Sequence, residues 1–443
     1  MNIQLSDHFT YKKLFQFTLP SIIMMVFTSI YGVVDGFFVS NFAGKTAFAA
    51  VNLVMPFVMI LGGVGFMIGT GGTALVSRVL GEGDKDRANR YFSMMVYGTL
   101  IIGLLLSVIG IAFMEPIAAF LGATEEMMGD CVLYGRLVIG FTAAFMLQNV
   151  FQSFLIAAEK PKLGLAATVA AGITNITLDA LFVGVFRWGC AGAAVATGLS
   201  QCIGGILSLL YFIRPNKSLL RLTKTKLEKG PLLRAFGNGS SELMSNISSS
   251  VVSMLYNFQL LKYIGEDGVS AYGVLMYVQF IFIAIFIGYS IGSAPVISYH
   301  YGAGNHAELK NMLKKSVSFS VLAGILLTIL AFLLAKPLAG IFVGYDKQLF
   351  DLTSHAFQLF SLSFLLAGFN IFASSFFTAL NNGAVSAAIS FLRTLVFQTS
   401  SVLILPFLLG VDGIWWAITV AEICACIISV IFLFARRRNY HYF

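Results

Sequence analysis

Charged residues are scarce in this chain of 443 residues. Asp, Glu, Lys and Arg together make up 11% of it, against about a quarter in an average soluble domain. Hydrophobic residues make up 58%. These values exclude an ordinary water-soluble domain and indicate a protein that crosses a membrane many times.

Cysteine and histidine are also rare. The five cysteines are odd in number and three of them lie in apolar runs, so no disulfide framework or zinc-ligand spacing is present. The five histidines form no H-E-x-x-H pattern, and AGKT at 43–46 lacks the first glycine of a phosphate-binding loop. The sequence therefore gives no sign of an enzyme or of ATP hydrolysis, and we expect no cofactor.

Apolar runs long enough to cross a bilayer recur along the chain. About 20 apolar residues cross the ~30 Å of hydrocarbon in a bilayer, and twelve runs reach that length. The seventh is the most polar, because it begins with GNGSSELMSNISSS. We predict an all-α integral membrane protein with twelve transmembrane helices. The predicted spans cover residues 15–40, 50–76, 91–113, 133–158, 163–186, 191–213, 235–262, 270–297, 314–335, 355–380, 385–409 and 413–435.

Basic residues are distributed unevenly between the predicted loops. If the N-terminus lies in the cytoplasm, 21 of the 28 Lys and Arg residues fall on cytoplasmic segments and six on the opposite side. Cytoplasmic loops of membrane proteins carry such an excess, so we expect both termini in the cytoplasm. The net charge of +8 therefore reports topology, and we expect no nucleic-acid partner.

The two halves of the chain resemble each other at a constant shift of 221 residues. Each half holds six predicted spans, an even number, so the halves should be related by a pseudo-two-fold axis along the membrane normal. Three segment pairs align: VSRVLGEGD (76–84) with ISYHYGAGN (297–305), EPIAAF (115–120) with KPLAGI (336–341), and GCAGAAVA (189–196) with GVDGIWWA (410–417).

This duplication predicts two six-helix lobes, a plan that many transporters share. In such proteins the binding groups lie near the membrane midplane and the lobes rock about them. The alternative is that the duplication only builds a larger scaffold. The predicted division is an N-lobe at 1–213 (helices 1–6), a basic cytoplasmic linker at 214–234 and a C-lobe at 235–443 (helices 7–12).

Four acidic residues fall inside predicted spans: Asp35, Asp179, Glu242 and Glu422. Carboxylates are costly in hydrocarbon, so such residues usually face the bundle interior or a water-filled cavity. The N-half spans offer no Lys or Arg to pair with Asp35 and Asp179, whereas Arg393 could serve an acid of the C-half. Unpaired carboxylates should bind a proton or hold a small cation. For Glu422 a polar contact between helices is the favoured interpretation.

Two local patterns accompany the N-half acids. Asn175 precedes Asp179 by four residues, which places an amide and a carboxylate on one helix face. That pair suits a proton or a monovalent cation, and the alternative is an interhelical hydrogen bond between the amide and a neutral acid. Pro20 lies fifteen residues before Asp35, where it permits a kink in the first helix unless it is an ordinary first-turn proline.

These motifs, taken in order, resemble the MATE (multidrug and toxic compound extrusion) transporters. The resemblance covers almost the whole chain through VDGFFVS, GTGGTALVSRVLGEGD, NITLDALF, GCAGAAVATGLSQ and IGSAPVISYHYGAGN. Within the family the sequence is most similar to the DinF-type branch and to MepA-like bacterial multidrug exporters. The resemblance therefore implies a multi-pass protein of the bacterial inner (plasma) membrane.

The family resemblance also implies a coupling site for H+ or Na+ in the N-lobe. It consists of Asp35, Asn175, Asp179 and Thr197, which would also be the ligands if the ion is Na+. Protonation at Asp35 is implied to bend the first helix around Pro20. The NorM branch has a second, C-lobe site with acids in the seventh and tenth helices. Glu242 fits the first position, but the span at 355–380 contains no Asp or Glu.

For the function, the resemblance implies a cation-coupled antiporter that exports lipophilic, often cationic compounds by alternating access. Its expected partners are these small substrates and membrane lipids, and we expect it to work as a monomer. The alternative within the same superfamily is a flippase for a lipid-linked precursor or an exporter of one endogenous metabolite. A flippase would need basic residues in its cavity for phosphates, and among the spans only Arg393 qualifies.

Overall fold

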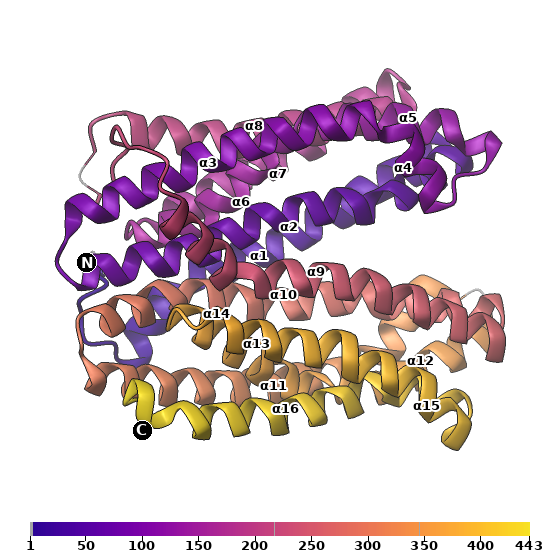
Figure 1. Cartoon of the computed structure of the whole chain (residues 1–443). Coiled ribbons are helices and arrows are strands. Elements are labelled where there is room, and N and C mark those ends of the chain that lie inside the picture. Colours follow the sequence, from indigo (N-terminus) through magenta and orange to yellow (C-terminus); the bar gives the residue numbers. More distant parts are fainter. Residues whose placement is uncertain (1–2, 217, 345) are drawn as a thin grey trace.

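The computed structural model consists almost entirely of helices, arranged in two groups (Figure 1). It describes residues 3–216, 218–344 and 346–443. Helices from the first half of the chain form one group and helices from the second half form the other, and both termini lie at the same end of the molecule (Figure 1).

The helices of the two halves follow one another in a similar order. The first half contains α1 (Tyr11–Phe38), the π-helical turn η1 (Val39–Ala43), α2 (Lys45–Gly81), α3 (Lys85–Ala112), α4 (Met114–Leu121), α5 (Glu125–Gly140), α6 (Thr142–Ala157), α7 (Pro161–Asp179), the π-helical turn η2 (Ala180–Val185) and α8 (Gly189–Ile213). The second half contains α9 (Lys229–Tyr263), α10 (Glu266–Gly302), α11 (His306–Val343), α12 (Lys347–Ser361), α13 (Phe364–Ala379), α14 (Gly383–Phe391), the π-helical turn η3 (Leu392–Gln398), α15 (Thr399–Leu409) and α16 (Val411–Tyr440).

These elements fit the predicted twelve-helix, two-lobe membrane fold. Among the described residues, nine helical segments are individually long and apolar enough to cross a bilayer. Two further pairs, α5 with α6 and α12 with α13, pass the same test as spans bent by 51° and 46°. The remaining long helix is α9, whose polar first half distinguishes it. It begins at Lys229, within the segment expected to be a linker, and Pro231 in its first turn is compatible with a helix start.

The repeat predicted from the sequence is visible in the backbone. Asp84 and Asn305, one repeat apart, cap α3 and α11, and each side chain accepts a hydrogen bond from the amide three residues ahead, at 3.0 and 3.1 Å. Glycines with positive φ, a conformation that costs other residues free energy, also recur at this spacing. Gly44, Gly83 and Gly189 correspond to Gly265, Gly304 and Gly410, all with φ from 60° to 95°.

The two lobes contact each other through glycines in the half of the molecule that carries the termini. A Cβ atom at Gly71 of α2 would overlap the carbonyl oxygen of Ala235, and one at Gly239 of α9 would overlap that of Met67. Gly81 and Gly302 make the same kind of reciprocal contact between α2 and α10. The backbones therefore meet without intervening side chains, as in close helix pairs of membrane proteins.

Helix α1 joins this contact on both sides of Pro20. A Cβ atom at Gly288 of α10 would lie 2.6 Å from the Cα atom of Ile22, and one at Gly292 would lie 3.1 Å from the Cα atom of Thr18. Pro20 itself is buried between these two positions. A change in the course of α1 at this proline would therefore alter its packing on the other lobe.

The segment before α1 connects the two lobes at the same end. The Leu5 amide donates to Glu159 Oε1 at 2.6 Å, in the connection between α6 and α7. The Phe9 amide donates to Glu308 Oε1 of α11 at 2.9 Å, and Glu308 Oε2 lies 2.7 Å from His8 Nδ1. Leu5 and Phe9 are fully buried. One short segment is thus anchored on both lobes.

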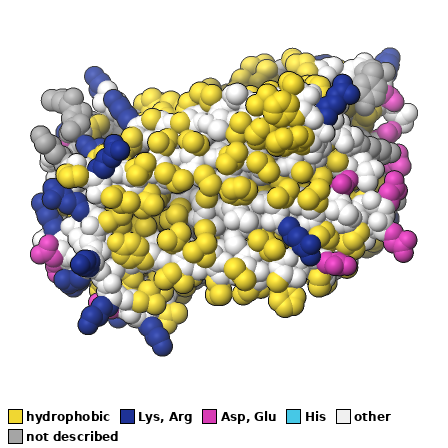
Figure 2. Space-filling model, turned by 90° about the horizontal axis from the view of Figure 1, so that it is seen from above, with side chains coloured by type: hydrophobic (Ala, Val, Ile, Leu, Met, Phe, Trp, Pro, Cys, Tyr) yellow, Lys and Arg dark blue, Asp and Glu magenta, His cyan; other side chains and the backbone are white. Residues whose placement is uncertain are grey.

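The surface shows an apolar belt with charge at the two ends. Figure 2 shows Lys and Arg gathered at the end that carries the termini and Asp and Glu gathered at the opposite end. Between them the surface is mainly hydrophobic, with side chains such as Leu104, Val108, Leu326 and Leu333 more than half exposed. Such a belt suits contact with lipid tails.

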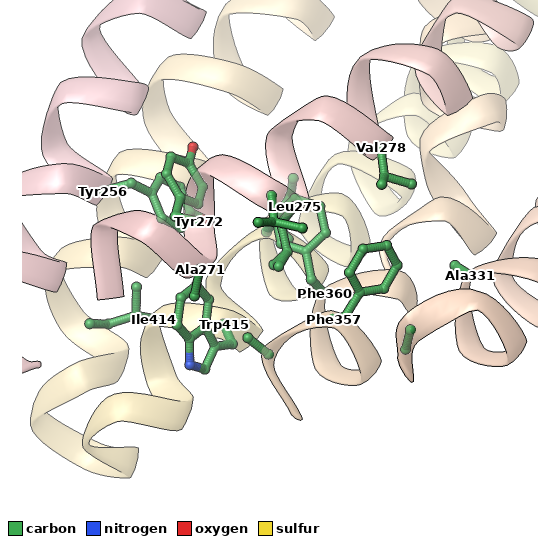
Figure 3. Packing of buried hydrophobic residues seen from close by; sticks show 14 of the residues in the cluster. Tyr256, Ala271, Tyr272, Leu275, Val278, Ala331, Phe357, Phe360, Ile414 and Trp415 are labelled. Carbon is green, nitrogen blue, oxygen red and sulfur yellow. The ribbon is translucent and has the colours of Figure 1, made fainter. Parts of the chain in front are cut away.

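The second lobe has its own aromatic core (Figure 3). The rings of Tyr256 and Tyr272 stack with centroids 4.9 Å apart and an interplanar angle of 6°. Trp415 and Phe357 are almost fully buried in the same cluster. This packing fixes α9, α10, α12 and α16 relative to one another and supports the wall of the cavity described below.

We expect the Gly239→Ala variant to destabilise the packed arrangement of the lobes by about 1–3 kcal/mol, because its Cβ would overlap the backbone of Met67. Gly237 is the matched control, since it lies on the exposed side of α9 and a Cβ there meets no described atom within 4 Å. Gly237→Ala should leave stability unchanged or raise it by up to ~1 kcal/mol. Thermal unfolding in detergent measures the stability of both variants. Equal melting temperatures for the two variants would contradict the close contact at Gly239.

Candidate functional site

A cavity of about 350 Å³ lies between the two lobes, within the usual size range of ligand pockets. Most of its wall comes from α9, α10, α13 and η3 of the second lobe. The first lobe contributes side chains of α1, α2 and α6. These are Met25, Ser29, Thr70, Thr73 and Ser153.

Two charged side chains, Glu242 and Arg393, line this cavity within the described part of the chain. Glu242 is half-buried on α9, and its carboxylate makes no ion pair with any described residue. Apolar and aromatic groups such as Phe280 and Tyr256 line other parts of the cavity. The cavity can therefore attract a positive charge at Glu242 and contact apolar groups elsewhere.

The four residues predicted for the N-lobe site lie on α1, α7 and α8, and α7 packs against both α1 and α8. Asp35 is 6% exposed near the end of α1, and Asp179 is fully buried as the last residue of α7. Their carboxyl groups are neighbours. Asn175 is 1% exposed one turn before Asp179, and Thr197 is half-buried on α8. The structure thus brings the two predicted acids together.

Unsatisfied polar atoms are concentrated in this N-lobe cluster. In a folded protein most buried polar atoms have a hydrogen-bond partner. Here several buried atoms find none among the described residues. They are Asp35 Oδ1, Asn175 Nδ2, Asp179 Oδ1, Asp179 Oδ2 and Thr197 Oγ1. Carboxylate and hydroxyl oxygens are ligands that hard cations accept, so the residues present fit either a proton or Na+.

The backbone around Asp179 is irregular. The α-helix α7 ends at this residue, and the π-helical turn η2 follows directly. The corresponding region of the second lobe contains another π-helical turn, η3, which carries Arg393. Such turns widen a helix locally and are frequent at functional sites. The apolar sequence ALFVGV of η2 does not indicate a π-helical turn.

Pro20 lies in the interior of α1, which runs without a break from Tyr11 to Phe38. The alternative interpretation of Pro20 as a first-turn proline is therefore wrong. A proline at this depth removes one backbone hydrogen bond from the helix and allows it to bend. Whether α1 bends during function stays a prediction.

The second lobe contains a buried ion pair at the cavity wall. Arg393 Nε donates to Glu422 Oε1 and Oε2 at 2.9 and 3.0 Å, and Arg393 Nη2 donates to Oε1 at 2.6 Å. Asn370 Nδ2 donates to Glu422 Oε2 at 2.7 Å. The interpretation of Glu422 as a polar interhelical contact agrees with this geometry, and Arg393 pairs with a C-half acid as foreseen.

Asn370 is the participant that the sequence analysis missed. It lies in α13, within the span at 355–380 that contains no acid, and it is fully buried. An isolated amide in the apolar run FLLAGFNIF was the available signal. The tenth predicted span therefore contributes the amide of Asn370 to the cavity wall, and it offers no second carboxylate to accompany Glu242.

Comparisons with known proteins agree with this fold. The sequence profile of the MatE family matches residues 20–181 and 243–402, more than half of the chain. The multidrug export protein MepA of Staphylococcus saprophyticus is 25% identical over 431 residues, which cover 97% of this chain and 94% of that protein. MepA of Staphylococcus haemolyticus is 25% identical over 432 residues, with the same coverage of both chains.

Solved structures show the same fold. An outward-facing multidrug resistance MATE family transporter of the MOP superfamily superposes with a TM-score of 0.93 at 21% identity, covering 100% of this chain and 99% of that chain. A MOP superfamily transporter from Pyrococcus furiosus gives a TM-score of 0.90 at 21% identity, covering 98% and 97%. With the family profile present in both halves, the chain belongs to the MatE family of membrane transporters.

Proposed function

We propose that this chain is an antiporter that exports lipophilic, often cationic compounds by alternating access and is driven by inward flow of protons or Na+. The observation that carries the proposal is the buried pair Asp35 and Asp179, which has no basic partner among the described residues. The names of the staphylococcal relatives, multidrug export proteins, support the same class of cargo.

The coupling chemistry follows from the position of the two carboxyl groups. Two ionised carboxylates side by side in a low-dielectric interior repel each other, so the pair needs a proton or a cation. Asn175 and Thr197 supply an amide and a hydroxyl beside the two carboxyl groups, and these groups can orient either a proton or Na+. Release of the proton or Na+ leaves uncompensated negative charge in the lobe. That charge favours the lobe conformation in which Asp35 and Asp179 can bind the ion again.

Helix α1 connects this coupling pair to the contact between the lobes. Asp35 lies on the part of α1 next to η1, whereas Thr18 and Ile22 pack on Gly292 and Gly288 of the other lobe. Pro20 lies between the last two positions. A change of charge at Asp35 that bends α1 at Pro20 would loosen or restore the contact between α1 and α10.

The orientation in the membrane follows from the charge distribution. The end rich in Lys and Arg carries both termini (Figures 1 and 2), and the positive-inside rule supports a cytoplasmic position for that end. The glycine contacts at this end then close the cavity toward the cytoplasm. We propose the bacterial plasma membrane as location, lipids around the apolar belt, and a monomer as the working unit.

The Asp179→Asn variant should lose most of its gradient-driven efflux, because an amide can neither release a proton nor bear the charge that holds Na+. Dye efflux from proteoliposomes, normalised to the amount of inserted protein, measures this. Asp130→Asn, on α5 at the opposite end from the termini, is the control and should transport normally. Full ion-dependent efflux by Asp179→Asn would show that the coupling site lies elsewhere.

The Glu242→Gln variant should bind cationic dyes about tenfold more weakly, equivalent to ~1.4 kcal/mol, because Glu242 lines the cavity and its carboxylate has no ion-pair partner among the described residues. An uncharged dye of similar size should bind with nearly unchanged affinity, since it gains nothing from that charge. Fluorescence polarisation of purified protein gives both affinities. Equal losses for charged and uncharged dyes would indicate a packing effect.

Imposing a pH gradient and a Na+ gradient separately tests the proposed function as a whole. The substrate is a fluorescent cationic dye in proteoliposomes that carry the wild-type chain. Efflux driven by pH alone identifies the proton as the coupling ion, and efflux driven by Na+ alone makes the same four residues a sodium site. Transport under neither gradient would overturn the antiport proposal and favour the flippase alternative.

A further inference from the structure

A second hollow, with a volume of about 340 Å³, lies on the first lobe and is separate from the cavity between the lobes. Helices α3 and α8 form its walls, and α6, which packs against both, forms its floor. In Figure 1 both α3 and α8 lie on the side of the first lobe that faces away from the second lobe. We call this hollow the lateral groove. Its lining residues are Val96, Tyr97, Leu100, Leu147, Leu209, Ile213 and Leu222.

The lateral groove is lined by hydrocarbon side chains and one phenol ring. Val96 and Leu147 are 2% and 7% exposed and lie at the bottom, whereas Leu100 and Ile213 are 40% and 61% exposed and lie at the rim. A groove of this kind on the apolar belt of a membrane protein is in contact with lipid tails. Its size is within the usual range of ligand pockets.

The segment after α8 closes the lateral groove at the end of the molecule that carries the termini. Leu222 of this segment belongs to the lining. The residues on both sides of Leu222 are fixed on α3, because the Arg221 amide donates to Asn89 Oδ1 at 2.9 Å and the Thr223 amide donates to Ser93 Oγ at 2.8 Å. The mouth of the groove therefore has a defined backbone.

Basic side chains surround this mouth. Arg214 directly follows the lining residue Ile213, and Arg221 directly precedes the lining residue Leu222, so each Cα atom is about 3.8 Å from that of a groove residue. Arg90 lies on α3 two turns before Tyr97 and on the same face. The sequence at 214–227 contains Lys and Arg but no Asp or Glu.

The three arginines at the mouth are available to a ligand. All three are exposed, and none of them makes an ion pair with a described residue. Arginine forms charge-assisted, often bidentate hydrogen bonds with phosphate groups. Basic residues next to the end of a membrane-spanning helix also attract anionic headgroups. The lateral groove thus combines an apolar slot with a phosphate-binding rim.

We propose that the lateral groove binds one acyl chain of an anionic phospholipid, whose phosphate contacts Arg214 and Arg221. Arg90 adds a third positive charge on the α3 side. The bound lipid touches α3, α8 and the segment that leads to the second lobe, and it holds the start of that segment on the first lobe. This inference goes beyond the proposed antiport and does not depend on the coupling ion or the cargo.

A tryptophan reporter in the lateral groove measures which lipid occupies it. The variant Tyr97→Trp keeps an aromatic ring at the groove and is reconstituted as the full chain into bilayers. These contain phosphatidylcholine and increasing amounts of phosphatidylglycerol, and either lipid can carry bromine atoms on its acyl chains. Brominated chains quench a tryptophan that they touch. Quenching of the native tryptophans, measured in the chain without the reporter, is subtracted.

Quenching of the reporter should show a preference for phosphatidylglycerol over phosphatidylcholine of at least about fivefold, the gain expected from one basic residue close to a headgroup. Equal binding of both lipids would mean that the groove holds ordinary surrounding lipid and would overturn the proposal. Because the reporter senses the acyl chain, free phosphate cannot produce the signal.

The double variant Arg214→Gln with Arg221→Gln, made in the reporter chain, should lower the preference to less than about twofold. The matched control is Arg436→Gln with Arg438→Gln, which removes the same charge from exposed positions of α16 in the second lobe. The control should keep the full preference. An unchanged preference in the first double variant, or an equal loss in both, would overturn the assignment of the two arginines. Both pairs change exposed side chains, and melting temperatures in detergent verify their folding.

Discussion

The cost of charge inside a membrane is the constraint on which the rest of this structure depends, and the two lobes meet it differently. In the first lobe Asp35 and Asp179 lie together without a basic partner among the described residues, and we propose that a proton or Na+ neutralises them. In the second lobe Arg393 neutralises Glu422 permanently. Under the proposed function the first lobe exchanges an ion, whereas the second lobe keeps its charge balance and forms most of the cavity wall.

The close backbone contact between the lobes would give the proposed ion exchange a mechanical consequence. Glycines such as Gly71 and Gly239 let the helices meet with no side chains between them, so even a small displacement must break the contact. Helix α1 contains Asp35 and also packs on α10 on both sides of Pro20. Under the proposed function, this single helix links the charge state of the first lobe to closure of the end that carries the termini.

The sequence predicted the features that are encoded locally or by repetition. The all-α two-lobe fold and the neighbouring acids Asp35 and Asp179 follow from hydropathy, from the repeat and from the family resemblance. The bends between α5 and α6 and between α12 and α13 were not foreseen, because tertiary packing determines where an apolar run breaks. The contact of Gly239 with Met67 joins positions far apart in the chain. The role of Asn370 beside Glu422 was hidden for the same reason.

Linkage between cargo and ion is the central claim, and calorimetric titration tests it most directly. Purified protein is titrated with rhodamine B ethyl ester in buffers of different ionisation enthalpy, with and without Na+. Because coupling between two sites is reciprocal, the account predicts that dye binding releases a proton or is weakened by Na+, and that Asp179→Asn abolishes this linkage. Dye binding whose enthalpy and affinity are independent of buffer and of Na+ would contradict it.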